Sequence, residues 1–272
     1  MPAESPRAQA VQLGDLNLHY TEWGEPTAPP MVLLHGFMAH ARTWDLFARD
    51  LASDYRILAL DQRGHGDTGA APGDSYTTDD YVGDLERFAA ALGLTRFVLV
   101  GMSMGGRNAI VYTARHPEAV AKLVIVDIGP QAPAPAAPRP DAPQDPGIFD
   151  NPSQVADFLR GQDPYPPEDY RQEVARHSVR QRPDGRYEWK WAPGLLTGRR
   201  GGWDTWAEWR SIRCPVLVVR GAESPVLSQD VAERMVRELP NARLVVAPRS
   251  GHPVQEDNAP ALIAAVREFL AE

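Results

Sequence analysis

The segment Gly101–Gly106 (GMSMGG) carries the strongest chemical signal in the sequence. It directly follows the apolar run Phe97–Val100 and opens a helical pattern, so we predict a sharp turn from a strand into a helix. In a G-x-S-x-G turn the serine backbone is strained, its hydroxyl is exposed, and the helix N-terminus favours developing negative charge. Gly101 and Gly105 are needed there because side chains would collide across the turn. We therefore expect Ser103 to be a nucleophile; the alternative is a glycine-rich turn without chemistry.

A serine hydroxyl needs a general base, and the sequence offers seven histidines. His252 is the best placed, because it follows the last predicted strand, in Ser250-Gly251-His252-Pro253, and precedes the final predicted helix. A lone histidine in a loop is usually a surface residue, but the flanking glycine and proline favour a functional role here. We expect His35 and His65, which lie in glycine-rich segments, to bond to backbone atoms instead.

These residues must be positioned by the elements around them, and short apolar runs alternate with helical patterns along the chain. Continuous apolar runs of this kind fit strands that are covered on both faces. The predicted strands are Met31–His35, Ile57–Asp61, Phe97–Val100, Leu123–Asp127, Val216–Arg220 and Leu244–Ala247. The predicted helices are Thr43–Ala52, Thr78–Leu92, Ser103–His116, Ser153–Arg160, Pro167–Arg180, Trp203–Arg210, Gln229–Leu239 and Ala259–Leu270. Gln12–Trp23 predicts an antiparallel hairpin that turns at Gly14-Asp15, and the alternation that follows predicts a mostly parallel sheet.

The sheet pattern stops near residue 129 and resumes near residue 215. Seven of the 26 prolines lie between Pro130 and Pro146, which predicts an extended connector, because proline fixes φ and lacks an N–H. We therefore expect a core made of residues 1–129 and 211–272, with residues 130–210 as a small, mainly helical insertion. Ligands of open α/β sheets bind beyond the carboxyl ends of the strands, where such an insertion would roof the site.

The composition limits the partners of the chain. Its formal net charge of −8 argues against nucleic acid or an anionic membrane surface as the main partner. The single cysteine, Cys214, excludes an intrachain disulfide and a multi-cysteine metal site, and it suits a reducing cytosol. No stretch approaches the length of a membrane span, and residues 1–10 lack the apolar region of a secretory signal. We expect a cytoplasmic protein without a membrane span.

Four motifs together resemble the α/β-hydrolase superfamily, and they occur in that family's order. They are His35-Gly36-Phe37, Asp61–Gly66 (DQRGHG), Gly101–Gly106 and Gly251-His252-Pro253. The resemblance covers essentially the whole chain except residues 130–210. It implies a mostly parallel, eight-stranded sheet flanked by helices, with the insertion as a lid. The family's order of serine, acid and histidine also fits His252 as the base.

The resemblance also implies an oxyanion hole. In this family one N–H comes from the loop after an early strand and the other from the residue that follows the nucleophile. Those positions are Phe37 and Met104 in this sequence. We also expect the side chains of Phe37 and Met38 to contact the substrate.

The acid departs from the commonest family pattern. Most relatives place an aspartate in a G-x-x-D turn after the strand that is Val216–Arg220 here, but this position holds Ser224. A subset of esterases and lactonases resembles this chain in placing the acid after the preceding strand, which favours Asp127. A carboxylate that ends a buried strand is costly unless it is paired, so it needs a partner such as His252. Glu223, one residue before Ser224, remains the alternative acid.

Five of the seven tryptophans lie in the insertion, and they have two interpretations. Trp189 and Trp191 alternate as in an extended segment, whereas Trp203 and Trp206 share one helix face that Trp209 continues. Such large side chains hold a small lid on a sheet, or they form an apolar wall for a substrate. We expect Trp189, Trp191, Trp203 and Trp206 to contact the substrate.

The resemblance implies a carboxylesterase-like serine hydrolase that cleaves small-molecule esters or lactones through an acyl-enzyme intermediate. The same triad in this superfamily can also run C–C bond hydrolysis, acyl transfer or perhydrolysis. The non-enzyme alternative is a hydrolase-like ligand receptor. Epoxide hydrolases and haloalkane dehalogenases fit less well, because their nucleophile is an aspartate and this chain has Ser103. No cofactor or metal is expected: the sequence has no P-loop, no G-x-G-x-x-G after a first strand and no H-E-x-x-H.

Overall fold

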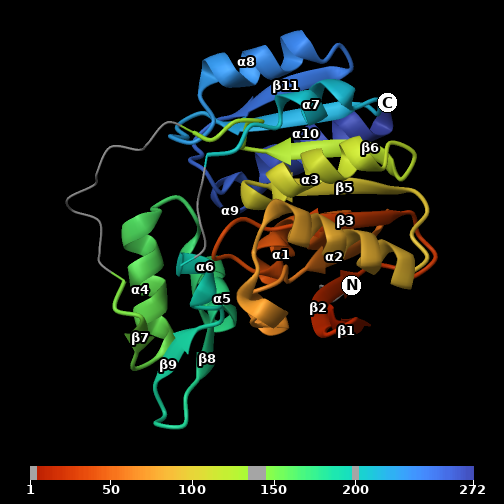
Figure 1. Cartoon of the computed structure of the whole chain (residues 1–272). Helices are drawn as coiled ribbons and strands as arrows, with labels where there is room; N and C mark the ends of the chain where they lie inside the picture. The colour runs from red at the N-terminus through yellow and green to blue at the C-terminus, as the bar shows by residue number, and fades with distance from the viewer. Residues whose placement is uncertain (1–4, 134–144, 198–201) are drawn as a thin grey trace.

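A computed structural model describes residues 5–133, 145–197 and 202–272 of the chain. Its centre is an eight-stranded sheet of order β1-β2-β4-β3-β5-β6-β10-β11 (Figure 1). The strands are β1 (Arg7–Leu13), β2 (Leu16–Trp23), β3 (Pro30–Leu34), β4 (Arg56–Leu60), β5 (Phe97–Met102), β6 (Val120–Val126), β10 (Val216–Gly221) and β11 (Ala242–Ala247). From β4 to β11 neighbouring strands pair in parallel, whereas β2 is antiparallel to both β1 and β4. The predicted mostly parallel sheet is confirmed, as is the hairpin, whose strands pair through Leu13 and Leu16 on either side of Gly14-Asp15.

Two hydrophobic layers cover the two faces of this sheet. Along β3, Val32 and Leu34 pack into one layer and Met31 and Leu33 into the other, which is the two-residue period of a strand. The first layer includes α2 (Thr78–Ala91), α3 (Met104–Arg115), α7 (Trp206–Ser211) and α8 (Gln229–Glu238); the second includes α1 (Asp45–Leu51) and α10 (Ala259–Ala271). Both faces of the central parallel strands are therefore buried, as their continuous apolar runs predict, whereas the edge strand β11 is only partly buried and its Val246 is exposed.

The insertion contains more than the predicted helices. Its elements are β7 (Ile148–Phe149), α4 (Pro152–Gln162), α5 (Glu168–Ser178), β8 (Val179–Gln181), β9 (Tyr187–Trp189) and α6 (Gly194–Thr197). The three short strands form an antiparallel sheet of order β7-β9-β8, which the sequence analysis did not predict. The helix predicted over Pro167–Arg180 is too long, because the chain turns into β8 at Val179. Figure 1 shows these elements grouped together at one end of the core.

The end of the insertion also differs from the prediction. Helix α7 contacts α3, and Trp209 on it is fully buried and donates to the carbonyl oxygen of Met235. The structure thus groups α7 with the core, although its residues up to 210 were assigned to the insertion. The predicted connector Pro130–Pro146 lies mainly within residues 134–144, outside the described residues. Within the described part of the chain, no helix has the length and apolar character needed to cross a membrane.

Candidate active site

Ser103 lies at the sharp turn between β5 and α3, where the sequence predicts it. Its backbone has φ 53° and ψ −117°, a strained conformation for a residue with a side chain. A Cβ atom on Gly101 would collide with the backbone of Gly105, and one on Gly105 would collide with the backbone of Leu34. The two glycines therefore allow strand, turn and helix to approach closely enough to hold Ser103 in this conformation.

A continuous series of hydrogen bonds runs from Ser103 through His252 to Asp127. His252 Nε2 lies 2.9 Å from Ser103 Oγ, and His252 Nδ1 lies 2.7 Å from Asp127 Oδ2. The Asp127 side chain is completely buried, whereas that of His252 is 27% exposed. The carboxylate therefore receives Nδ1–H and leaves Nε2 as the acceptor for the serine hydroxyl.

Adjacent strands bring Asp127 beside Ser103. Met102 at the end of β5 pairs with Val126 at the end of β6, and each of the two functional residues follows one of these partners. Asp127 has φ 52°, and its Oδ1 accepts a hydrogen bond of 2.9 Å from the backbone N–H of Gly221. Together with the bond from His252, this contact offsets the cost of burying the charge.

The second candidate acid, Glu223, contacts the insertion. Glu223 is exposed, and its carboxylate accepts a hydrogen bond from the hydroxyl of Tyr165 in the insertion. Its neighbour Ser224 is buried and donates to Asp127 Oδ2, a contact that the sequence analysis missed. The position that holds the aspartate of the G-x-x-D pattern therefore provides a hydrogen-bond donor to Asp127 in this chain, instead of an acid.

The residues assigned to the oxyanion hole lie around Ser103. Met104 is the first residue of α3, so its N–H is at the helix N-terminus. The segment before Phe37 passes close to the nucleophile: a Cβ atom on Gly36 would lie 3.4 Å from Ser103 Cβ. Phe37 and Met38 both line the cavity described below.

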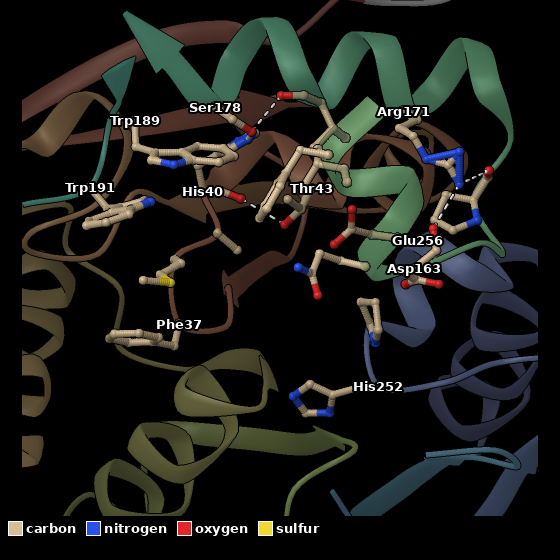
Figure 2. Close-up of a pocket in the computed structure, with 18 of the residues that line it drawn as sticks. Phe37, His40, Thr43, Asp163, Arg171, Ser178, Trp189, Trp191, His252 and Glu256 are labelled. Atoms are coloured by element: carbon tan, nitrogen blue, oxygen red, sulfur yellow. Dashed lines mark hydrogen bonds between the residues drawn. The ribbon is translucent and has the colours of Figure 1, made fainter. Parts of the chain in front are cut away.

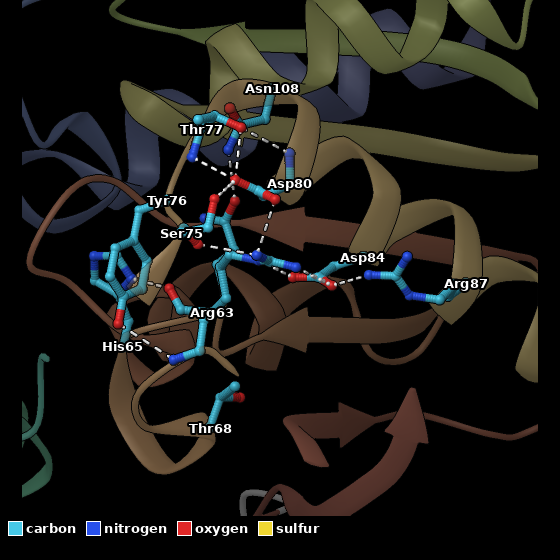
Figure 3. A network of polar contacts seen from close by, with 12 residues as sticks. Arg63, His65, Thr68, Ser75, Tyr76, Thr77, Asp80, Asp84, Arg87 and Asn108 are labelled. Atoms are coloured by element: carbon cyan, nitrogen blue, oxygen red, sulfur yellow. Dashed lines mark hydrogen bonds and ion pairs between the residues drawn. The ribbon is translucent and has the colours of Figure 1, made fainter. Parts of the chain in front are cut away.

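Arg63 of the motif Asp61–Gly66 takes part in a polar network with Asp80 and Asp84 of α2 (Figure 3). Arg63 makes a two-pronged contact with Asp84 on α2, with Nε–Oδ2 2.5 Å and Nη2–Oδ1 2.8 Å. Gln62 donates through its side chain to the carbonyl oxygen of His35, at 2.7 Å. The motif thus ties α2 to the loop that carries Phe37.

His35 and His65 are buried and bond to backbone atoms, as expected. His35 Nδ1 lies 2.7 Å from the carbonyl oxygen of Gly36, and His35 Nε2 accepts from the N–H of Gln62. His65 Nδ1 lies 2.9 Å from the carbonyl oxygen of Arg63. Burial lowers the pKa of His35 to about 3 and that of His65 to about 4, so both rings are neutral at pH 7.

A cavity of about 640 Å³ lies between the core and the insertion and is open to His252 (Figure 2). Its walls are mainly apolar and aromatic, including Phe158, Trp189 and Trp191. Trp189 is fixed by hydrogen bonds of 2.9 Å from Nε1 to both carboxylate oxygens of Asp145. Such a cavity fits a small or medium-sized organic substrate.

Trp203 and Trp206 do not line this cavity, so the expectation that they contact a substrate there is wrong. The guanidinium of Arg107 lies over the Trp203 ring at 5.0 Å, and that of Arg234 over the Trp206 ring at 3.8 Å. Trp206 Nε1 donates to Gln131 at 2.9 Å. The shared helix face assumed for these two residues does not exist, because α7 begins only at Trp206.

One group of described residues has the arrangement of a possible metal site. His19, Asp61 and Asp67 each offer a ligand atom, and these atoms lie within 4.8 Å of one another. All three are already engaged: His19 Nδ1 lies 2.7 Å from Asp61, which also accepts from the N–H of Ala41, and Asp67 pairs with Lys190 at 2.7 Å. These bonds explain the arrangement without an ion.

Comparisons with known proteins show which protein family the chain resembles. A family model described as "alpha/beta hydrolase fold" matches residues 29–259. The chain is 28% identical to 2-(acetamidomethylene)succinate hydrolase of Mesorhizobium japonicum, over 97% of this chain and 95% of that protein. It is 30% identical to 3-hydroxybutyrate-oligomer hydrolase of Cupriavidus necator, over 97% and 98%. A thioesterase domain from the curacin biosynthetic pathway has a similar structure, with a TM-score of 0.84 at 23% identity over 97% of this chain and all of that one.

Proposed function

Because the chain belongs to the α/β-hydrolase fold family, in which its relatives are hydrolases, we propose that it is a serine hydrolase of carboxylic esters or lactones. The observation that carries this proposal is the series of hydrogen bonds from Ser103 through His252 to Asp127, of 2.9 and 2.7 Å. A serine, a base and an orienting carboxylate in this geometry form an acyl-transfer triad.

The reaction begins when Ser103 Oγ attacks the acyl carbonyl carbon and His252 Nε2 takes the hydroxyl proton. The backbone N–H groups of Phe37 and Met104 stabilise the oxyanion of the tetrahedral intermediate, a contribution of about 3 kcal/mol for each donor. His252 returns the proton to the alkoxy group, which leaves as the alcohol. Asp127 holds the imidazole in the required tautomer and stabilises its protonated form.

The second half-reaction releases the acid. His252 accepts a proton from a water molecule, whose oxygen attacks the carbonyl carbon of the acyl-enzyme. Collapse of the second tetrahedral intermediate breaks the bond to Ser103 Oγ, and His252 returns the proton to the serine. With a lactone, the acyl and alcohol groups remain in one molecule, which leaves as a hydroxy acid.

Hydrolysis of p-nitrophenyl esters from acetate to octanoate tests the proposal, with wild type and Ser103→Ala compared side by side. We expect wild-type turnover and near-background rates in the variant. The optimum chain length then measures the usable length of the cavity. If the wild type shows neither turnover nor an acyl burst, simple ester hydrolysis is excluded, and C–C bond hydrolysis or ligand binding without turnover must be tested instead.

A further inference from the structure

The cavity has two chemically different sides beyond His252. Figure 2 shows Phe37, Trp189 and Trp191 on one side of His252, with Asp163, Arg171 and Glu256 on the other. We call the second group, Asp163, Arg171 and Glu256, the polar side. An ester has an acyl and an alcohol group, so a substrate with its carbonyl at Ser103 extends one of them toward the polar side.

The positively charged residue of the polar side, Arg171, already bonds to other groups of the protein. Arg171 Nη1 contacts a carboxylate oxygen of Glu168 at 3.3 Å. Its Nη2 donates to the carbonyl oxygens of Asp163, at 3.1 Å, and of Pro166, at 2.8 Å. The guanidinium therefore secures the turn between α4 and α5, and it is poorly placed to anchor a substrate carboxylate.

Glu256 contributes a different kind of polar group. It lies on the short helix α9 (Val254–Asp257), four residues after His252, and in Figure 2 it lies between Thr43 and Asp163. Gln255 Nε2 donates to its Oε1 at 3.3 Å, and Oε2 has no hydrogen-bond partner among residues 5–133, 145–197 and 202–272. The carboxyl group thus lines the cavity with one oxygen available to an occupant.

The protonation of this carboxyl group follows from its surroundings. Burial raises the pKa of Glu256 to about 8, the negative charge of Asp163 acts in the same direction, and Arg171 opposes them. At pH 7 the group is therefore mainly an uncharged acid with an O–H to donate.

We propose that Glu256 is a specificity-determining residue that donates a hydrogen bond to an uncharged oxygen of the substrate. The substrate class is then a neutral ester with a carbonyl or ether oxygen in the group that extends toward the polar side. This inference rests on the proposed ester hydrolysis. A donor on the wall of a cavity favours a substrate that satisfies it, because a hydrocarbon chain in the same place leaves the donor unpaired.

Matched esters test the inference. In the acyl series, p-nitrophenyl hexanoate is compared with p-nitrophenyl 5-oxohexanoate and with the carboxylate mono-p-nitrophenyl adipate. In the alcohol series, hexyl acetate is compared with 5-oxohexyl acetate. Each kcat/KM is divided by the rate of hydroxide hydrolysis, which removes differences in intrinsic reactivity. We expect the wild type to prefer the keto ester about tenfold in one of the two series.

Two variants distinguish the effect of the hydrogen bond from the effects of the shape and charge of the Glu256 side chain. Glu256→Gln keeps a donor, and we expect it to keep the preference; Glu256→Leu removes the donor, and we expect the preference to disappear. We expect the wild-type preference for the keto ester to fall between pH 7 and pH 9, because the O–H is lost as Glu256 ionises. Over the same pH range, mono-p-nitrophenyl adipate, which carries a carboxylate, becomes a poorer substrate. In Glu256→Gln the preference is independent of pH.

Other ionisable side chains lie near Glu256, namely Asp163, Arg171 and Tyr170 of the insertion, and His252 and Asp257 on its own side of the cavity. All of them remain in Glu256→Gln, so an equal pH slope in that variant would assign the wild-type slope to them and contradict the role of Glu256.

The inference is overturned if the wild type does not distinguish the keto esters from the hydrocarbon esters, or if Glu256→Leu keeps the preference. If the proposed function itself is wrong, the result is different: no hydrolysis depends on Ser103. In that case equilibrium binding of the same esters to Ser103→Ala, with and without Glu256→Leu, still measures the preference for the keto group.

Discussion

The hydroxyl of Ser224 donates a hydrogen bond to Asp127 Oδ2, the same oxygen that lies 2.7 Å from His252 Nδ1. The common pattern of the family places the acid itself at the Ser224 position, whereas here this position supports an acid on the neighbouring strand. The backbone N–H of Gly221 occupies the other carboxylate oxygen. Asp127 is therefore held at both oxygens in an orientation that serves His252.

Replacement of Asp127 by asparagine should lower kcat about 10⁴-fold without unfolding the protein, because the amide stabilises the wrong tautomer of His252. Steady-state kinetics on the best p-nitrophenyl ester measures the effect, with circular dichroism to check the fold. Glu223→Gln is the matched control and should be close to wild type, because Glu223 is exposed and contacts Tyr165. Near-normal turnover in Asp127→Asn, together with a crippled Glu223→Gln, would reverse the assignment of the acid.

Ser224→Ala should lower kcat roughly tenfold, because Asp127 loses one of the hydrogen bonds that orient its carboxylate. The effect should appear in kcat more than in KM, since Ser224 does not line the substrate cavity. Ser211→Ala provides the control, because its hydroxyl is exposed and bonds only to the carbonyl oxygen of Glu208 among the described residues. Equal kcat values in the two alanine variants would show that the Ser224 hydroxyl does not support catalysis.

Arg63→Ala should lower the free energy of unfolding by about 3–5 kcal/mol, because it leaves the buried carboxylate of Asp84 without its main partner. The side chains of Arg63 and Asp84 are only 8% and 5% exposed. Arg115→Ala breaks a pair with Asp79 whose side chains are 45% and 77% exposed, and it should cost less than about 1 kcal/mol. Urea unfolding of both variants checks this contrast; similar losses would contradict it.

The pH dependence of stability should differ between the wild type and Glu256→Gln. The pKa of Glu256 is raised from 4.5 to about 8 in the folded protein, so the unfolded chain releases this proton at lower pH than the folded protein does. Its contribution to stability is therefore complete below pH 4.5 and is lost as the pH rises toward 8. Between pH 5 and pH 8 the wild type should lose up to about 4 kcal/mol relative to the variant, measured by urea unfolding. Parallel pH curves would contradict the raised pKa.

Trp191→Ala should shift the preferred acyl chain toward longer esters, because it removes a ring from the cavity wall. We expect the ratio of kcat/KM for octanoate to that for butyrate to rise about tenfold. Trp206→Phe should leave this ratio unchanged and lower stability by about 1–2 kcal/mol, because it removes the hydrogen bond to Gln131 and weakens the contact with Arg234. A changed ratio in Trp206→Phe would indicate that this residue does affect the substrate.

The core and the sharp turn that carries Ser103 were predictable because their signals are local. The alternating strands and helices, and the glycines around Ser103, follow from side-chain volume and backbone geometry at neighbouring positions. The small sheet of the insertion was not predictable in this way, because β8 and β9 contain three residues each and depend on contacts with one another. Trp203 was misassigned because helical spacing was extended across Thr205, whose backbone is not helical and whose N–H bonds to the carbonyl oxygen of Pro130.

Ser103 and Asp127 each follow one of two directly paired residues on neighbouring strands, so the ladder of the sheet fixes their separation. His252 lies on the loop between β11 and α9, outside that ladder, and the loop backbone is held by separate hydrogen bonds, from Glu223 N–H to Ser250 and from Gly251 N–H to Asp257. Parts of a protein with fewer buried contacts open at lower free energy than its core strands do. On heating, this loop would release the base while the serine and the acid stay aligned, so the enzyme would lose activity below the temperature at which its sheet melts.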